Sequence, residues 1–455
     1  MILINLYFVE ETHPWTPLKR GVSGISLNMN YKSLMQKKLP EYIYQLLKSI
    51  GEVGYLMGYP AFVVGGFVRD LILGRANLDV DIVIEGDGIN FASRFAEAKK
   101  GTVKCHERFG TAVITLPDGF KIDVATARTE IYAHPGALPS VQFGSINDDL
   151  RRRDFTINAM AINLKDDKFG ELVDVLDGLS DLQEHKIKVI HEQSFSDDPT
   201  RIFRAIRYEQ RYGFGLDWNT RGMLNYAIDR EFLKTITRQR LRNEILLILN
   251  EDNASRPLNR MRQSDLMRYI HPEILLNNRK LNLIYKISEM NSFMPLPFLK
   301  ANEKIDYALI KLMILLDGLN ETDVIDVSER LALSKKYTEA LKSSIAKLPK
   351  ALFIISEETT APSKIYEALN GLPFDTLIYS IFKADKSTIY QIMLYLTVLR
   401  DTKPIITGKD LKELGYSEGP IYNEILSMVF YAQLDEKIGS KQEAIEFIKL
   451  KRKDQ

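Results

Sequence analysis

Hydrophobic and polar positions follow two different patterns along the chain. Between residues 31 and 58, apolar positions recur every three or four residues, which predicts one helix over that range. From residue 60 to about residue 163, short β-branched runs alternate with helical stretches. We expect strands at 62–64, 80–84, 112–116, 121–125 and 157–163. This alternation predicts an α/β domain built on a mixed sheet.

After about residue 170 the pattern is helical and we expect no further strands. Two prolines and two glycines between residues 132 and 144 predict a loop. The helical part should break near residues 250–253, 294–297, 360–362 and 403–404. Thr407 and Asp410 have the spacing of a capping box. Residues 1–30 carry no clear pattern, and their role stays open.

Composition narrows the class of protein. The chain has 455 residues, of which 45% are hydrophobic and 27% are charged, which predicts several packed domains. Its formal net charge is only +1, so a nucleic-acid-binding face would have to be local. The single cysteine, Cys105, excludes an intramolecular disulfide and is typical of a reducing cytoplasm. No apolar run approaches the length of a membrane span.

Two aspartates at alternate positions suggest a metal site. Asp79 and Asp81 flank Val80 at the start of an apolar run, so on a strand their side chains point to the same side. Charges beside apolar neighbours need a cation between them. Upstream lie Gly65 and Gly66, where backbone N–H groups can approach an anion closely. An acidic turn that binds backbone donors is the alternative for an isolated pair of this kind.

Other residues extend this pattern. Arg69 and Asp70 follow the glycines, and Asp123 lies in another apolar strand that should neighbour the first in the sheet. Three strand carboxylates at one point would form a two-metal site for in-line attack on a phosphate. The sequence leaves open whether Asp123 belongs to that site or is a structural acid.

Three consecutive arginines, at positions 151–153, precede Asp154 and Asn158. Such runs are usually solvated. Because the apolar segment that follows is buried, we expect at least one arginine to turn inward. Its anion would be a triphosphate or Asp154.

A further segment, SDDPTR at 196–201, suggests how a base could be chosen. Ser196 or Asp197 could cap a helix with Pro199 in its first turn, so that Asp198 and Arg201 would be neighbours at i and i+3. A surface ion pair is the ordinary interpretation. As a functional pair, the carboxylate would accept from an amino group and the guanidinium would donate to a ring nitrogen. Cytosine and adenine present that edge, whereas guanine and uracil present the reverse.

Later arginines belong to the same region. Arg204 and Arg207 continue the three-residue step from Arg201. Arg240 and Glu244, at i and i+4, favour a structural role in which they brace the helix that carries the Asp198 and Arg201 pair. Direct contact with nucleic acid is the alternative.

In this order, these segments resemble the class II tRNA nucleotidyltransferase and bacterial poly(A) polymerase family. GGFVRD with LDVD resembles its motif A, RRDFTINA motif B, DVLDG at 174–178 motif C, SDDPTR motif D and RLRNE motif E. The match covers roughly residues 60–250. YLTVLR at 395–400 and TGKDLKELG at 407–415 resemble bacterial members. Motif D often begins Glu-Asp in the family, whereas here it begins with Asp197 and Asp198.

The resemblance implies a fold and a domain order. It implies an α+β catalytic head of the nucleotidyltransferase (polymerase beta-like) type with a small mixed sheet, followed by an all-α neck, body and tail. The implied boundaries are an extension at 1–30, the head at 31–165, a neck with the base template at 166–255, the body at 256–360 and a tRNA-binding tail at 361–455.

The resemblance also implies roles for residues. Asp79 and Asp81 would bind Mg²⁺, with Asp123 as a further catalytic candidate. Asp198 and Arg201 would template the incoming base. The other implied nucleotide-binding residues are Gly65, Gly66, Arg69, Arg153, Asp154, Asn158, Arg204 and Arg207.

The implied reaction adds CMP, AMP or both to the 3′ end of tRNA from CTP and ATP. One metal would activate the 3′ hydroxyl for attack on the α-phosphate, and pyrophosphate would leave on the second. Relatives that add all of CCA often carry charged residues between motifs A and B, but residues 131–144 have no arginine, lysine or acid. The repertoire therefore stays open between CCA, the terminal A and CC. A poly(A) polymerase and a noncatalytic tRNA-binding protein are the alternatives, and the oligomeric state is unknown.

Overall fold

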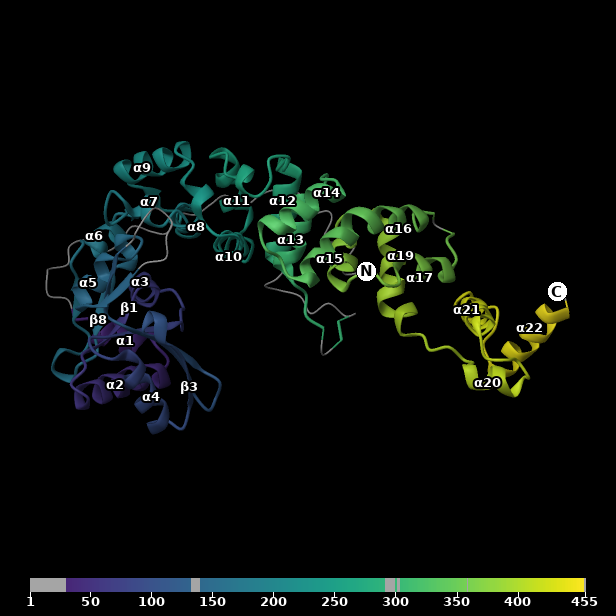
Figure 1. Ribbon diagram of the computed structural model, residues 1–455, viewed down its shortest axis with the longest axis horizontal. Helices are drawn as coiled ribbons and strands as arrows, with labels where there is room; N and C mark the ends of the chain where they lie inside the picture. The colour runs from purple at the N-terminus through teal and green to yellow at the C-terminus, as the bar shows by residue number, and fades with distance from the viewer. Residues whose placement is uncertain (1–29, 132–139, 291–298, 301–302, 358, 454–455) are drawn as a thin grey trace. The chain divides into compact units, whose positions relative to one another are not determined.

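A computed structural model describes residues 30–131, 140–290, 299–300, 303–357 and 359–453. The chain divides into two compact units between Glu244 and Ile245, and each is described by itself. Figure 1 colours them by residue number, with the first in purple to teal and the second in green to yellow.

The first unit contains the mixed sheet that the sequence predicts. Its strand order is β3-β4-β5-β2-β1-β8-β9 among the described residues. All neighbours are antiparallel except β2 and β5, which are parallel. The strands are β1 (Ala61–Val64), β2 (Val80–Ile84), β3 (Thr102–His106), β4 (Thr111–Thr115), β5 (Lys121–Thr126), β8 (Met160–Asn163) and β9 (Leu172–Asp174).

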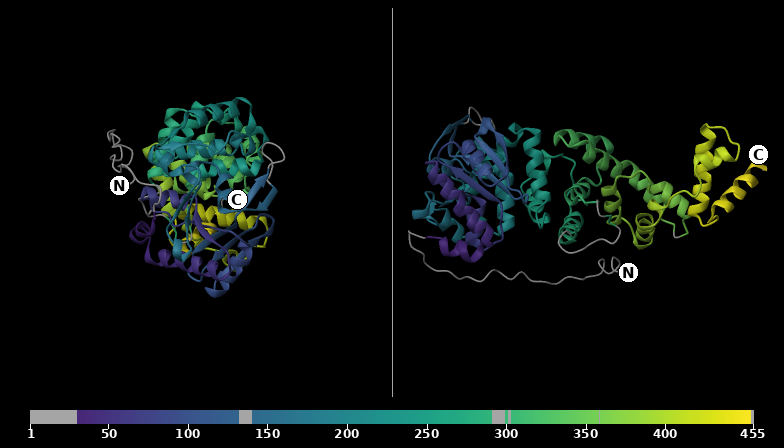
Figure 2. Two further views of the ribbon diagram at one scale, coloured as in Figure 1. Left: turned by 90° about the vertical axis from the view of Figure 1, so that its left-hand side faces the viewer. Right: turned by 90° about the horizontal axis from the view of Figure 1, so that it is seen from below.

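Different helices cover the two faces of the sheet. On one face, Phe62, Val64 and Val83 share a buried cluster with Ile146 and Leu150 of α5 (Ile146–Arg151). On the other lie α2 (Glu41–Leu56) and α4 (Gly88–Ala98), which contact each other and the sheet (Figures 1 and 2). Because side chains alternate along a strand, Asp81 shares the α5 face with Val83.

Several expected boundaries in this unit are wrong. The helix predicted over 31–58 is two helices, α1 (Lys32–Lys38) and α2, because Pro40 has no N–H with which to continue a helix. The strand predicted at 157–163 begins only at Met160, after a 3₁₀ turn at Thr156–Asn158. Strands also continue beyond residue 170 in β9 and in the parallel pair of β10 (Lys186–Ile187) and β11 (Gly215–Leu216).

The loop predicted over 132–144 is partly a strand. β6 (Arg128–Ile131) pairs antiparallel with β7 (Ser140–Phe143), so residues 140–143 are not loop. Residues 132–139 lie outside the described residues. The remaining helices of this unit are α3 (Gly66–Leu73), α6 (Gly178–Gln183), α7 (Ser194–Asp197), α8 (Arg201–Tyr212), α9 (Trp218–Asp229) and the first part of α10 (Arg238–Leu249).

In its described part, the second unit consists of helices joined by turns and loops, without a strand. The expected breaks near 250–253, 360–362 and 403–404 are confirmed, and the one at 294–297 falls outside the described residues. Its helices are α11 (Ser255–Gln263), α12 (Asn278–Met290), α13 (Tyr307–Leu316), α14 (Glu321–Arg330), α15 (Lys335–Lys342), α16 (Leu348–Ile354), α17 (Pro362–Leu369), α18 (Phe374–Ile381), α19 (Lys386–Thr397), α20 (Gly408–Glu413), α21 (Pro420–Leu434) and α22 (Lys441–Lys453).

The last three helices, yellow in Figures 1 and 2, pack around their own apolar cluster, which includes Leu411, Val429 and Ile448. The capping box of Thr407 and Asp410 opens α20 as expected. Among the residues that the structure describes, no helix has both the length and the apolar character needed to cross a membrane.

A buried lysine closes the end of α10. Lys311 of α13 is 2% exposed, and its ammonium donates to the carbonyl of Leu249 at 2.9 Å and to that of Glu251 at 3.4 Å. These carbonyls lie at and just beyond the C-terminus of α10, where the helix lacks its own donors. Burial lowers the pKa of Lys311 to about 8, against the opposing charges of Asp252 and Glu251.

Candidate active site

Three carboxylates gather at the start of β2. Asp81 pairs directly with Asp123 in the parallel register of β2 and β5, which confirms that the two strands are neighbours. Asp79 is exposed and lies one residue before β2. Burial and the charge of Asp79 raise the pKa of Asp81 to about 6, and Asp123 adds to this while Arg153 opposes it. Burial and Asp79 also raise the pKa of Asp123.

These carboxylates have the donor chemistry of a site for a hard divalent cation. Carboxylate oxygens are the ligands that Mg²⁺ prefers. Burial and the charge of Asp79 raise the pKa of Asp81, and a bound cation would offset both effects. Within the described part of the chain, no three His, Cys, Asp or Glu side chains already stand close enough together to hold an ion. Asp79 and Asp81 could hold one after side-chain rotation, with Asp123 as the third candidate.

A tight glycine turn lies beside these acids. Gly65 directly follows β1 with φ +70°, a conformation that favours glycine, and Gly66 opens α3. A Cβ on Gly65 would lie 2.7 Å from Nη1 of Arg153. The glycine therefore allows Arg153 to lie against the turn, within electrostatic reach of Asp81.

The arginine run is held by an acid that the sequence pattern did not single out. Asp149, fully buried in α5, accepts from Arg152 at 2.9 and 2.5 Å through one oxygen and from Arg153 at 3.2 and 3.0 Å through the other. The expectation that at least one arginine turns inward is confirmed, because the Arg152 and Arg153 side chains are only 18% and 19% exposed. Of the two anions expected for it, Asp154 is wrong, since Asp149 takes that place. The sequence does contain a pattern that predicts these pairs, because Arg152 and Arg153 follow Asp149 by three and four residues, the spacing of neighbours on a helix.

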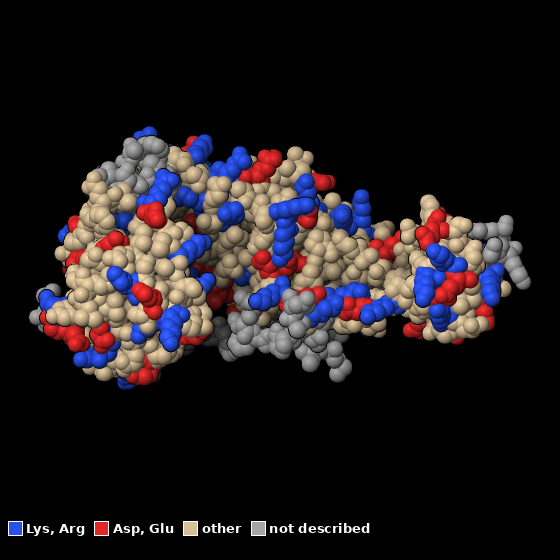
Figure 3. Space-filling view, turned by 60° about the horizontal axis from the view of Figure 1, so that its bottom comes forward, with Lys and Arg blue, Asp and Glu red and all other residues tan. Residues whose placement is uncertain are grey.

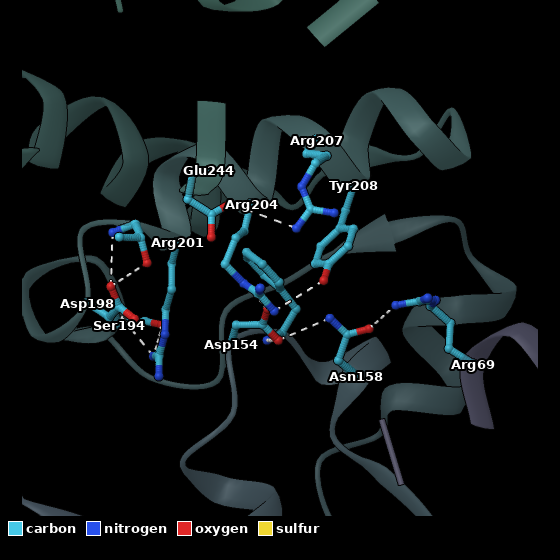
Figure 4. A network of polar contacts seen from close by, with 12 residues as sticks. Arg69, Asp154, Asn158, Ser194, Asp198, Arg201, Arg204, Arg207, Tyr208 and Glu244 are labelled. Carbon is cyan, nitrogen blue, oxygen red and sulfur yellow. Dashed lines mark hydrogen bonds and ion pairs between the residues drawn. The ribbon is translucent and has the colours of Figure 1, made fainter. Parts of the chain in front are cut away.

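Asp154 instead joins α8 to α3 through a line of hydrogen bonds (Figure 4). Arg204 donates to Asp154 Oδ2 through Nε at 2.8 Å and Nη2 at 2.5 Å. Asn158 Nδ2 donates to Asp154 Oδ1 at 3.0 Å, and Asn158 Oδ1 accepts from Arg69 Nη1. Although burial opposes ionisation, the charge of Arg204 and the Asn158 hydrogen bond lower the pKa of Asp154 to about 2.

The geometry expected around Asp198 differs from the structure. Asp198 follows α7 and precedes α8, which begins only at Arg201, so the two residues are not on one helix. Neither Ser196 nor Asp197 caps α8; Thr200 holds that position. The Asp198 carboxylate accepts from the Thr200 backbone at 3.0 Å and hydroxyl at 2.6 Å, and from Arg240.

Arg201 has separate partners. Its buried guanidinium donates to the Ser194 hydroxyl at 2.7 Å (Figure 4). It also donates to the Arg152 carbonyl at 2.9 Å. These bonds fix Arg201 beside the corner that carries Asp198, without a direct ion pair between the two. The Asp198 carboxylate and the Arg201 guanidinium therefore do not neutralise each other.

The bracing contacts expected from α10 are confirmed. Arg240 pairs with Asp198. Glu244 lies 3.8 Å from Nη2 of Arg207, which is 4% exposed (Figure 4). Tyr208 lies between the arginines of α8, with its ring 5.5 Å from the Arg204 guanidinium carbon and 4.8 Å from that of Arg207. The residues of motif C form a turn, because Asp174 accepts from three backbone N–H groups that include Gly178.

Comparisons with known proteins agree with this geometry. Residues 61–188 match the poly A polymerase head domain, and residues 226–276 match a probable RNA- and SrmB-binding site of polymerase A. Among solved structures, an apo CCA-adding enzyme is 32% identical with a TM-score of 0.76, covering 94% of this chain and 100% of that one. A Thermotoga maritima CCA-adding enzyme complexed with tRNA is 30% identical with a TM-score of 0.70, with coverages of 94% and 100%.

Two relatives are named A-adding tRNA nucleotidyltransferases. That of Geobacter sulfurreducens is 39% identical over 90% of this chain, which spans only 47% of the Geobacter protein. That of Halalkalibacterium halodurans is 30% identical over 92% of this chain and 95% of its own length. The shared motifs, the shared fold and this full-length similarity lead to one conclusion: the chain belongs to the tRNA nucleotidyltransferase and poly(A) polymerase family.

Proposed function

We propose that this protein is a Mg²⁺-dependent tRNA nucleotidyltransferase that adds AMP, CMP or both to the tRNA 3′ end from ATP and CTP. The observation that carries the proposal is the position of Asp81 opposite Asp123, with Asp79 beside them, next to the glycine turn at Gly65. Family membership supports it, because nucleotidyltransferases of this family generally use divalent metals. We place the activity in the cytoplasm, where its tRNA substrate is processed.

The reaction joins the tRNA 3′ oxygen to the α-phosphorus of the nucleotide. The bond between the α-phosphorus and the bridging oxygen breaks, pyrophosphate leaves, and the hydroxyl proton passes to solvent. Bound Mg²⁺ would supply the Lewis acid for this transfer, held by Asp79 and Asp81. The chain itself presents the backbone of Gly65 and Gly66 and the guanidinium of Arg153 to the triphosphate.

Base choice would lie at the corner between α7 and α8. Asp198 would accept from an exocyclic amino group and Arg201 would donate to the neighbouring ring nitrogen, which admits C and A. Arg240 and Ser194 hold these two side chains in place before a nucleotide arrives. A network of hydrogen bonds and ion pairs behind this corner would orient the template residues and the sugar and phosphates of the nucleotide. Its members are Arg69, Asp154, Asn158, Arg204 and Arg207.

Within this proposal, the relatives and the sequence favour a repertoire that includes AMP. Both curated relatives described above are A-adding, and the sequence between motifs A and B lacks charged residues at 131–144. A poly(A) polymerase would need a broadly basic surface to bind generic RNA. On the face that Figure 3 shows, Lys and Arg are instead interspersed with Asp and Glu, in keeping with the net charge of +1.

The test is an incubation of the full chain with Mg²⁺ and each labelled nucleotide in turn. The acceptors are a tRNA lacking its last three nucleotides, the same tRNA ending in CC, and an unrelated RNA hairpin. The proposal expects incorporation of A or C into tRNA alone, and none by Asp79→Ala. Equal labelling of the hairpin would favour a poly(A) polymerase, and no labelling at all would favour a binding protein.

A further inference from the structure

Asn77 lies in the short connection between α3 and β2, directly before the proposed metal site. Of residues 75–79, the other four are exposed and Asn77 alone is half-buried. Leu78, the one large apolar side chain there, is 41% exposed, so the connection contributes little to the core. Contacts that hold this segment in place therefore also determine the position of Asp79.

The Asn77 amide makes two hydrogen bonds in opposite directions. Its Oδ1 accepts from the backbone N–H of Asp79 at 2.8 Å, and its Nδ2 donates to Oδ2 of Asp70 at 2.8 Å. The first bond alone would be an ordinary turn within the loop. The second ties that turn to Asp70, which is 7% exposed, and so to the interior of the head.

Asp70 is itself held from two elements. Arg69 donates to both of its oxygens, at 2.9 and 2.8 Å, and the Tyr212 hydroxyl of α8 donates to Oδ1 at 3.3 Å. The Arg69 guanidinium carbon also lies 4.7 Å from the centre of the Tyr212 ring. An unbroken series of contacts therefore leads from α8 through Asp70 and Asn77 to the backbone of Asp79.

We propose that Asn77 is a positioning residue for the divalent-metal carboxylate Asp79, and that it couples this carboxylate through Asp70 and Tyr212 to the helix that begins with Arg201. The inference rests on the proposed function for the identity of the metal ligands. It assigns a role to a residue outside the recognised motifs. Removing a residue that orients a metal ligand typically lowers the affinity for the metal by about 10–100-fold.

The test is a titration of the full chain with Mn²⁺, in which free Mn²⁺ is counted by its paramagnetic resonance signal without nucleotide or tRNA. Asn77→Ala should weaken Mn²⁺ binding by about 10–100-fold. Asn77→Ser keeps a hydroxyl that can close the local turn but cannot reach Asp70, so it should also bind Mn²⁺ more weakly than wild type. Tyr212→Phe should shift the affinity in the same direction by a smaller factor. Asn90→Ala, at an exposed position on α4, is the matched control and should leave binding unchanged.

A kinetic readout separates positioning from general damage. In Asn77→Ala the half-saturating Mg²⁺ concentration for transfer should rise, kcat should recover at high Mg²⁺, and the preference among the four nucleotides should stay as in wild type. A melting curve for each variant establishes that the titration is made on folded protein, and Asn77→Ser serves if Asn77→Ala does not fold.

The outcomes distinguish this inference from the proposed function. If Asp79→Ala loses the ion while both Asn77 variants bind it as wild type does, the inference is overturned and the proposed function stands. If Asn77→Ser alone binds as wild type, the link to Asp70 has no role and the coupling is overturned. If Asp79→Ala also binds the ion as wild type does, the proposed metal site and this inference are both overturned.

Discussion

Asp81 on β2 and Asp123 on β5 stand directly opposite each other in the one parallel pair of the described sheet. Side chains at paired positions of neighbouring strands lie on the same face, so the two acids lie side by side. Asp79, one residue before β2, adds a third carboxylate near them. Folding therefore brings like charges together at this edge, and burial together with the charges of Asp79 and Asp123 raises the pKa of Asp81.

Replacing Asp81 should separate activity from stability. The folded pKa of Asp81 is raised from 3.8 to about 6, so its charge costs folding free energy above pH 6, and this cost disappears below about pH 4, where both states are protonated. With metal chelated, Asp81→Asn should be more stable than wild type at pH 8 by about 1–3 kcal/mol and equally stable at pH 3.5, yet inactive in transfer.

Urea unfolding at the two pH values measures this difference. Asp229→Asn, at an exposed position on α9, is the control for removing a charge. An active Asp81→Asn enzyme would show that this carboxylate has no part in the chemistry.

Replacing Asp198 should change which nucleotide is chosen more than how tightly triphosphate binds. Without the carboxylate, an incoming amino group loses its acceptor and a carbonyl edge is no longer rejected. Asp198→Ala should therefore reduce discrimination against G and U by roughly 1–3 kcal/mol, or about 5–150-fold. Arg240→Ala should have a smaller effect in the same direction, because Arg240 holds Asp198.

Competition between labelled nucleotides on one tRNA measures that ratio, with Arg238→Ala as a control on an exposed neighbour in α10. An unchanged preference among the four nucleotides in Asp198→Ala would refute the template role.

Removing Asp154 should destabilise the first unit in a pH-dependent way. Its folded pKa is lowered from 3.8 to about 2, so its contribution is present above about pH 4 and is lost as the pH falls through 2. Asp154→Ala leaves Arg204 and Asn158 without their acceptor and should cost about 3 kcal/mol at pH 7. That is the lower end for a broken buried pair, because the Arg204 side chain is 31% exposed.

Thermal melting of Asp154→Ala against wild type, with exposed Asp166→Ala as control, measures this loss. A difference that does not shrink between pH 4 and pH 2 would contradict the ionic origin of the contribution.

Lys311 supplies a separate test in the second unit. Its folded pKa is lowered from 10.5 to about 8, so the penalty for its charge is complete below pH 8 and disappears by about pH 10.5. Wild type should therefore gain stability relative to Lys311→Met as the pH rises from 7.5 to 10. At pH 10 the variant should be less stable by about 1–3 kcal/mol, because two buried carbonyls lose their donor.

The exposed Lys335→Met change is the control, with a side chain that is 89% exposed in wild type. A pH-independent difference between Lys311→Met and wild type would show that Lys311 is not forced to bury its charge.

The sequence predicted the strands that carry the site because their patterns are local. Val80–Ile84 and Lys121–Thr126 are continuous apolar or alternating runs, and they proved to be neighbours in a mixed sheet as expected. The break of the first helix was missed although Pro40 marks it, because apolar spacing continues on both sides. β3 was missed because its residues are largely exposed and lack a buried face.

Partners of charged groups were harder to predict than elements. The spacing of Asp198 and Arg201 suggested an ion pair on one helix, but Pro199 and the turn before α8 place them on different elements. Asp154 pairs with Arg204, fifty residues away, and not with the arginines next to it, because Arg152 and Arg153 already pair with Asp149. Such pairings depend on tertiary distances that one-dimensional spacing does not contain.

The most direct test of the account is the product that the full chain makes from a tRNA ending in CC, with ATP and Mg²⁺ as the only additions. Resolved to single nucleotides on a gel, the product should be longer by one A and then stop, and Asp79→Ala should leave the tRNA unextended. An unextended tRNA with the wild-type chain, or a long A tract, would contradict the assignment as a tRNA nucleotidyltransferase that adds A.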